Sequence, residues 1–221
     1  MDLILSFIPL AFAAITPAML AAIIFLLGLD DGLLRAGMFM AGRLLTYAGW
    51  SLVLFIFTER VFELNSGSHT DFILLLKAIL GFFLIAMAFK IFLGGDDPDD
   101  LPAKVMAIFN QISPLPLFGL GVLVSIFQVR HILLLFVGVT EIIFADLAIP
   151  EAVLATSVLI ILINASQLTI FVVALTLPGR SDAWFSSTNA WLTQNNRQVA
   201  AFISLMGLFL LWDGISSLGI F

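Results

Sequence analysis

Six long apolar segments, separated by short polar breaks, dominate the sequence and limit what it can fold into. Each has at least about 20 residues, the length that a helix needs to cross the hydrocarbon core of a bilayer. Every backbone amide in that core must find a partner within the protein, which favours helices. The segments run over residues 3–28, 33–58, 72–93, 117–144, 151–177 and 198–220. The sequence therefore predicts an all-α, polytopic membrane bundle in one domain, residues 1–221.

Composition supports a membrane protein and excludes other classes. Apolar residues are 62% of the chain and charged residues 11%, where soluble proteins have roughly 45–50% and 25%. The net charge of −6 excludes a nucleic-acid-binding protein, because phosphate binding needs a basic surface. The chain has no cysteine, which excludes disulfides, thiol redox relays, iron–sulfur clusters and covalent c-type haem within it.

The positions of lysine and arginine predict which way the bundle faces. The breaks after the first, third and fifth segments, with adjoining helix ends, hold Arg35, Arg43, Lys90, Lys104, Arg180 and Arg197. The opposite side holds Arg60, with Lys77 counted at its nearer end. Because basic residues concentrate on the cytoplasmic side, we expect both termini outside. The cytoplasmic loop 94–114 would contain the acidic stretch 96–100 and, over 101–112, either a short interfacial helix or an amphipathic linker.

The six segments divide into two halves of three that share two features. Gly81-Phe82-Phe83-Leu84-Ile85 in the third segment resembles Gly207-Leu208-Phe209-Leu210-Leu211 in the sixth. The first segment is interrupted by Thr16-Pro17, and the fourth carries Gln128-Val129-Arg130-His131 at its middle. Because each half has an odd number of helices, the second half would insert upside down. We therefore expect a 3+3 inverted repeat with broken first and fourth helices, as in several transporters.

A few polar residues lie where the bilayer makes them costly. An arginine at the bilayer centre costs about 2.5–3.5 kcal/mol on insertion scales, so Arg130 should face a partner or a water-filled cavity. Glu141 lies about 16 Å from Arg130 along a straight helix, and Asp213 is the other candidate partner, so the choice stays open. The candidate substrate path comprises Pro17, Arg43, Gln128, Arg130, Glu141, Asn164, Gln167 and Asp213.

Two stripes of polar residues extend this set. Arg43, Tyr47 and Ser51 follow one another at spacings of four in the second segment. The fifth segment has Ser157, Asn164 and Gln167 at spacings of seven and three, which places them on one helix face. The alternative for such residues is ordinary hydrogen bonding between helices, typically about 0.6 kcal/mol per contact.

The sequence gives little support to a cofactor or to catalysis. The chain has two histidines, and His69 falls in an outer loop whereas His131 lies within the fourth segment. We therefore expect no metal site, and His131 is either a proton-relay residue or a hydrogen-bonded bystander. No nucleophile elbow, Gly-rich phosphate loop or paired His-Glu metal motif occurs, so we expect no enzyme and no cofactor.

Short runs in a characteristic order, spread over nearly the whole chain, carry a family resemblance. They are Ile8-Pro9-Leu10, Thr16-Pro17-Ala18-Met19-Leu20, Ala41-Gly42-Arg43-Leu44-Leu45-Thr46, Gly95-Asp96-Asp97-Pro98, Phe109-Asn110-Gln111-Ile112-Ser113-Pro114, Arg130-His131-Ile132-Leu133-Leu134, Gly138-Val139-Thr140-Glu141-Ile142, Gln167-Leu168-Thr169-Ile170-Phe171 and Ala190-Trp191-Leu192-Thr193-Gln194-Asn195-Asn196-Arg197. With these runs the chain resembles the glycopeptidolipid-addressing, or sulfolipid-addressing, family of bacterial membrane proteins within the lysine-exporter superfamily.

The resemblance implies a six-helix protein whose relatives export amino acids or are associated with moving glycolipids toward the cell surface. Some members of the wider group conduct reducing equivalents through a cysteine pair, which this chain lacks. The family supplies no catalytic set to carry over. The candidate residues above therefore rest on charge and depth alone.

Three functional hypotheses follow. The leading one is a multi-pass transport protein of the bacterial inner membrane that exports a small polar or amphipathic solute, or assists envelope lipid export, between the two halves. The second is an accessory protein that docks an envelope lipid synthesis or export complex through the acidic loop. The third is a proton- or cation-coupled carrier that uses Glu141, Asp213 and His131. The expected partners are the bilayer, a small solute or lipid, and either a second copy in a homodimer or an envelope export complex.

Overall fold

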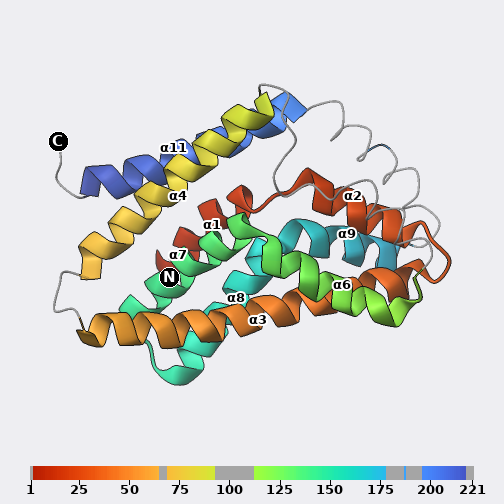
Figure 1. The fold of residues 1–221 in the computed structure, drawn as a ribbon, viewed down its shortest axis with the longest axis horizontal. Helices are drawn as coiled ribbons and strands as arrows, with labels where there is room; N and C mark the ends of the chain where they lie inside the picture. The colour runs from red at the N-terminus through yellow and green to blue at the C-terminus, as the bar shows by residue number, and fades with distance from the viewer. Residues whose placement is uncertain (1, 65–68, 93–111, 178–186, 188–195, 218–221) are drawn as a thin grey trace.

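The computed structural model describes residues 2–64, 69–92, 112–177, 187 and 196–217 (Figure 1). These residues contain helices and no strand, so the predicted all-α fold is confirmed for them. The helices are α1 (Asp2–Ala13), α2 (Pro17–Leu27), α3 (Gly32–Leu64), α4 (His69–Phe92), α6 (Pro114–Phe127), α7 (Val129–Phe144), α8 (Ile149–Ile163), α9 (Ala165–Thr176) and α11 (Asn196–Ser217). The acidic stretch 96–100 and most of the predicted interfacial helix lie outside the described residues.

All six apolar segments contain helix, but only three of them form a single helix. These are α3, α4 and α11, which cover the second, third and sixth segments. The first, fourth and fifth segments are each divided, into α1 and α2, α6 and α7, and α8 and α9. The breaks in the first and fourth segments confirm the prediction, whereas the break in the fifth is a feature that the sequence patterns did not predict.

The three breaks differ in their local geometry. Thr16 is extended (φ −120°, ψ 110°) before Pro17, and proline cannot donate the amide hydrogen bond that would continue α1. Gln128 leaves helical geometry with ψ at 77°, and α6 and α7 meet at a bend of 73°. At Asn164 the side-chain amide donates to the carbonyl of Ile160 at 2.9 Å. The backbone N–H of Asn164 donates to the same carbonyl at 3.2 Å, and α8 and α9 meet there at a bend of 75°.

The broken helices affect how many membrane crossings the helix lengths support. Among the described residues, one stretch, Gly32–Thr58 within α3, is long and apolar enough to span a membrane by itself. If each of the bent pairs α6–α7 and α8–α9 counts as one span, the number rises to three. Shorter apolar stretches lie in α1, α4 and α11. The six crossings, the inverted repeat and the outward termini therefore remain predictions.

The apolar core has two parts, one on each side of the helix breaks. The larger part gathers side chains from α1, α4, α7, α8, α11 and the second half of α3. The smaller part gathers side chains from α2, α6, α9 and the first half of α3. The unbroken helix α3 contributes to both parts, so the polar residues at its middle lie between two apolar clusters.

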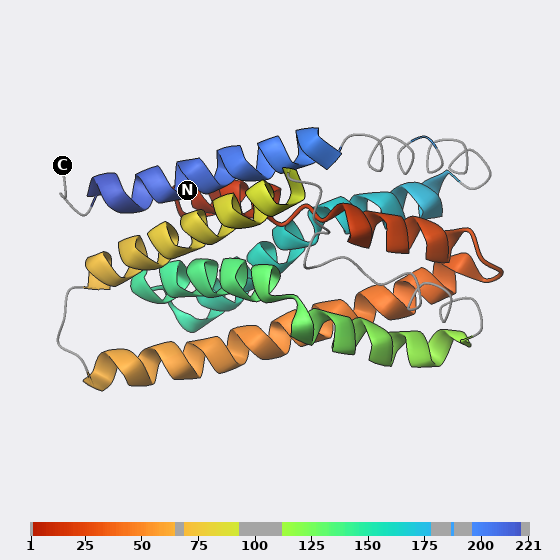
Figure 2. The same ribbon diagram turned by 45° about the horizontal axis from the view of Figure 1, so that its top comes forward.

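Glycines allow two helix pairs to approach to backbone contact. A methyl group on Gly42 would overlap the backbone of Phe118, and one on Gly121 would overlap that of Phe39, so α3 and α6 pack tightly. The α4–α11 pair, side by side in both views (Figures 1 and 2), meets in the same way at Gly81 and Gly207. Close glycine packing of this kind is typical of helices in membranes.

Candidate functional site

The three helix breaks meet at a buried polar site, which we call the arginine centre. Its members come from α3, from the breaks themselves and from the first turn of α7. They are Thr16, Arg43, Tyr47, Gln128, Arg130 and Asn164. Each of these side chains is at most 3% exposed, so the site is closed off between the two apolar clusters.

Arg43 lies at the middle of this site and reaches two of the breaks. Its Nη1 atom donates to the Gln128 side-chain oxygen at 2.8 Å and lies 3.2 Å from the Met19 sulfur. Its Nη2 atom donates to the Tyr47 hydroxyl at 3.1 Å and to the Asn164 side-chain oxygen at 3.5 Å. The guanidinium also lies 5.5 Å from the centre of the Tyr47 ring, within the range of a cation–π contact.

All of these contacts are to neutral groups. Arg43 is fully buried, and no ion pair is formed with it in the part of the chain that the structure describes. Its Nε atom is buried without a hydrogen-bond partner. A buried charge without a counter-charge costs several kcal/mol, so neutral acceptors compensate this guanidinium only in part.

Tyr47 connects Arg43 to the start of α7. Its hydroxyl donates to the Gln128 side-chain oxygen at 2.8 Å. Its ring stacks on that of His131, with centroids 5.9 Å apart and the planes 12° from parallel. Ser51 in turn donates to the Tyr47 carbonyl at 2.9 Å. The predicted stripe of Arg43, Tyr47 and Ser51 is thus a buried, connected row.

Arg130 joins the breaks of the first and fourth segments. Its Nη2 atom donates to the Thr16 hydroxyl at 2.5 Å, and Thr16 immediately precedes Pro17, the first residue of α2. Arg130 is fully buried, as its predicted depth requires. Four of the eight candidate residues, Arg43, Gln128, Arg130 and Asn164, therefore belong to the centre, and Pro17 adjoins it through the backbone.

Helix ends of both polarities meet here. The N-termini of α2, α7 and α9 lie at the three breaks together with the C-termini of α1, α6 and α8, and the side chains of Thr16, Gln128 and Asn164 make no capping hydrogen bond to the helices that follow them. Because a helix N-terminus carries about half a positive charge and a C-terminus about half a negative one, the fixed positive charge of the centre comes from its arginines.

Gln167 lies close to this site in the sequence, but no hydrogen bond joins its side chain to the site among the described residues. It is fully buried, three residues beyond Asn164, and neither of its side-chain amide atoms has a hydrogen-bond partner among the described residues. Ser157, in contrast, is exposed. The predicted single polar face of the fifth segment is therefore wrong, because the bend at Asn164 separates Ser157 from the other two.

Glu141 and Asp213 belong to a second polar group, which we call the lysine cluster: Ser6, Lys77, Glu141 and Asp213. Lys77 on α4 forms ion pairs with Glu141 at 2.7 Å and with Asp213 at 2.9 Å. Ser6 donates to the other carboxylate oxygen of Glu141 at 2.5 Å. Both carboxylates proposed as partners for Arg130 thus bind Lys77.

Sequence reasoning missed the roles of Lys77 and Ser6. Lys77 falls inside an apolar segment, which was a usable signal of a buried partner, but it was counted as a topology marker. Ser6 gave no such signal. The charge count also includes Arg43, which is a candidate path residue as well and is buried. Removing Arg43 and Lys77 from the charge count changes six against two to five against one, so the predicted orientation is unaffected.

Comparison with known proteins gives one match. The family model described as Sap, sulfolipid-1-addressing protein, matches residues 7–216. No curated protein matches the chain, and no solved structure does. The match covers the arginine centre, all of the lysine cluster except Ser6, and every helix from α2 to α9 in full.

Proposed function

Because the chain belongs to the sulfolipid-1-addressing family, we propose that it is a multi-pass protein of the bacterial inner membrane that moves an anionic amphiphile toward the cell surface. The arginine centre binds the anionic group during that movement. The ligand class is a lipid or solute bearing a sulfate, phosphate or carboxylate.

The observation that carries this proposal is the buried charge of Arg43. Its guanidinium has only neutral acceptors in the described part of the chain and keeps one unpartnered N–H. A guanidinium binds sulfate, phosphate or carboxylate oxygens through paired hydrogen bonds. An anion at this position would supply the missing counter-charge.

The architecture that best supports such movement is six crossings in a 3+3 inverted repeat, with both termini outside. Two contacts support the repeat. Gly81 and Gly207, the matching glycines of the two halves, lie against each other. Thr16 and Arg130, at the breaks of the two leading helices, are hydrogen-bonded. Broken helices that meet near the membrane midplane are a recurrent substrate site in such transporters.

The test is lipid flux in proteoliposomes. Fluorescent phosphatidylglycerol serves as the anionic probe and fluorescent phosphatidylcholine as the zwitterionic one, with dithionite quenching reporting the leaflet. We expect Arg43→Gln and Arg130→Leu to lower phosphatidylglycerol flux about tenfold or more, since one lost charged contact is worth about 1.5–3 kcal/mol. Arg43→Lys keeps the charge but not the planar fork, and should give intermediate flux.

Arg35→Gln is the matched control. Arg35 lies two turns earlier on α3 and donates to backbone carbonyls of Asp30 and Ile112 outside the centre. Its replacement should leave flux unchanged. Normal flux in folded, inserted Arg43→Gln and Arg130→Leu proteins would overturn the assignment. Flux that persists after deletion of residues 96–100, with loss of a co-purifying protein, would favour the accessory role.

The lysine cluster favours a second candidate, a proton-coupled carrier. Glu141 and Asp213 share one cation, and Asp213 is partly exposed. A carboxylate that exchanges its partner for a proton could couple flux to a gradient. This candidate predicts that a proton gradient accelerates flux and that Glu141→Gln removes the acceleration.

A further inference from the structure

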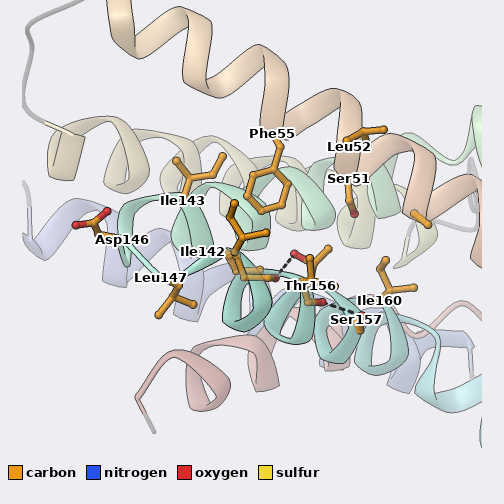
Figure 3. Close-up of a pocket in the computed structure, with 14 residues that line it drawn as sticks. Ser51, Leu52, Phe55, Ile142, Ile143, Asp146, Leu147, Thr156, Ser157 and Ile160 are labelled. Carbon is orange, nitrogen blue, oxygen red and sulfur yellow. Dashed lines mark hydrogen bonds between the residues drawn. The ribbon is translucent and has the colours of Figure 1, made fainter.

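A groove lies beside the arginine centre, between α3, the end of α7 and α8 (Figure 3). Its volume is about 510 Å³, and its walls are mostly apolar side chains such as Phe55, Ile142 and Leu147. This volume is within the range of ligand pockets, roughly 300–1,000 Å³.

The few hydroxyl groups in the groove are already engaged. Thr156 and Ser157 donate to the carbonyls of the residues four earlier on α8, each at 2.8 Å (Figure 3). Ser51 donates likewise to the Tyr47 carbonyl. Because these donors are satisfied within their own helices, the groove offers an apolar surface to whatever fills it.

The groove opens among exposed apolar side chains. Leu52 on α3 is 63% exposed and Val153 on α8 is 61% exposed, and both line it. In a protein of a lipid-addressing membrane family, such side chains face hydrocarbon. The opening is therefore accessible from the bilayer.

The inner end of the groove adjoins the arginine centre on two helices. On α3, Ala48 lines the groove and lies five residues from Arg43. On α8, Ile160 lines the groove, and its carbonyl accepts the side-chain hydrogen bond from Asn164. Along each helix the groove residue is about one turn from the residue of the arginine centre, a rise of roughly 5–8 Å.

The outer end of the groove carries a negative charge, opposite in sign to the arginines near the inner end. Asp146, in the turn between α7 and α8, lines that end (Figure 3). Its carboxylate repels an anionic headgroup there, whereas the arginines attract one at the inner end. The charge distribution thus fixes a direction for an amphiphile: headgroup inward, chain along the groove.

From these contacts we infer that the groove binds an acyl chain of the same amphiphile whose anionic group binds the arginine centre. The inference rests on the proposed function and adds to it the place where the acyl chain binds. Bilayer hydrocarbon is as apolar as the groove, so the groove contributes little affinity. Its contribution is to hold the chain in one place and orientation, and a test must therefore report position.

Photolabelling gives that position. The protein is placed in phosphatidylcholine nanodiscs together with hexadecyl sulfate, whose alkyl chain carries a diazirine at its middle. Labelled peptides are then mapped by mass spectrometry. Hexadecyltrimethylammonium with the same diazirine is the cationic comparison. We expect the sulfate probe to label the groove walls on α3 and α8 at least about threefold more than the cationic probe does, a preference of about 0.7 kcal/mol.

Two blocking variants test the location. Ser157→Trp and Leu52→Trp place an indole in the groove from opposite walls, and should lower its labelling by the sulfate probe at least about threefold. Thr176→Trp is the matched control, because Thr176 is also exposed, also donates to the carbonyl four residues earlier, and lies outside the groove. It should leave labelling unchanged.

The outcomes separate this inference from the function on which it rests. If Arg43→Gln lowers anionic flux but the sulfate probe labels positions outside the groove, the acyl-chain site is overturned and the proposed function stands. If both probes label the groove equally and Arg43→Gln changes neither labelling nor flux, the groove holds ordinary bilayer lipid, and both proposals are overturned.

Discussion

The arginine centre and the lysine cluster both place cations within the helical bundle, but they neutralise them differently. Lys77 has two carboxylate partners, from Glu141 and Asp213. Arg43 is more deeply buried and has only neutral acceptors in the part of the chain that is described. Since buried charges are normally paired, the cation of the lysine cluster is neutralised by its neighbours, whereas the charge of the arginine centre is left without a carboxylate partner in the described residues.

The two regions also differ in their backbone. The lysine cluster lies on helices that run uninterrupted past it, whereas the arginine centre lies where three helices are broken. Breaks leave backbone groups without helical partners, which a membrane protein tolerates only beside protein or a cavity. The two regions therefore predict opposite responses when their cation is removed.

The largest effect on stability is expected for Lys77→Met. The substitution leaves Glu141 and Asp213 without their shared cation, which should lower the free energy of unfolding by about 2 kcal/mol. Breaking a fully buried pair costs about 3–5 kcal/mol, and the partial exposure of Asp213 reduces this. Thermal unfolding in detergent micelles, followed by tryptophan fluorescence, measures the change. Lys77→Arg is the control, and an unaltered Lys77→Met protein would show that the cluster does not hold the helices together.

Part of this comparison could be predicted from the sequence. Pro17 and the polar residues around Gln128 interrupt apolar segments, so both breaks were predictable from local chemistry. Asn164 is compatible with a helix and is flanked by apolar residues, so no sequence pattern marks its break.

Partner choice was not predictable. Lys77 meets Glu141 and Asp213 across three helices, and only tertiary packing sets that geometry. For Arg43, inside the predicted segment 33–58, the sequence leaves ordinary hydrogen bonding between helices and a role in the path equally open. Its burial follows from the way that α6 packs on α3 at Gly42 and Gly121.

Arg43→Met should lower transport of the anionic probe and leave stability nearly unchanged, in contrast to Lys77→Met. Replacing a buried, incompletely paired ion with an apolar side chain is often neutral or stabilising, so we expect the unfolding free energy to change by less than about 1 kcal/mol. Flux of the anionic probe should fall about tenfold or more. The same unfolding and flux assays measure both. A loss of stability as large as that of Lys77→Met would make the arginine centre a structural core.

Glu141→Gln should have a smaller effect, because Lys77 keeps its ion pair with Asp213 and the amide oxygen still accepts hydrogen bonds. The expected loss is about 1 kcal/mol of unfolding free energy. If the cluster couples transport to protons, the acceleration of flux by a proton gradient disappears in this variant while basal flux remains. Asp213→Asn, which alters the more exposed carboxylate, is the comparison. Retained gradient dependence in both variants would limit the cluster to a structural role.

The smallest effect is expected for Gln167→Leu. Both amide atoms of Gln167 are buried without partners in the described residues, so an apolar side chain of similar size removes an unsatisfied group and should change stability by no more than about 0.5 kcal/mol, in the stabilising direction. Gln128→Leu is the matched control, since its side-chain oxygen accepts bonds from Arg43 and Tyr47, and its loss should be destabilising. A severalfold loss of anionic flux in Gln167→Leu, at unchanged stability, would add Gln167 to the arginine centre. Unchanged flux would confine the anion site to the residues that contact Arg43 and Arg130.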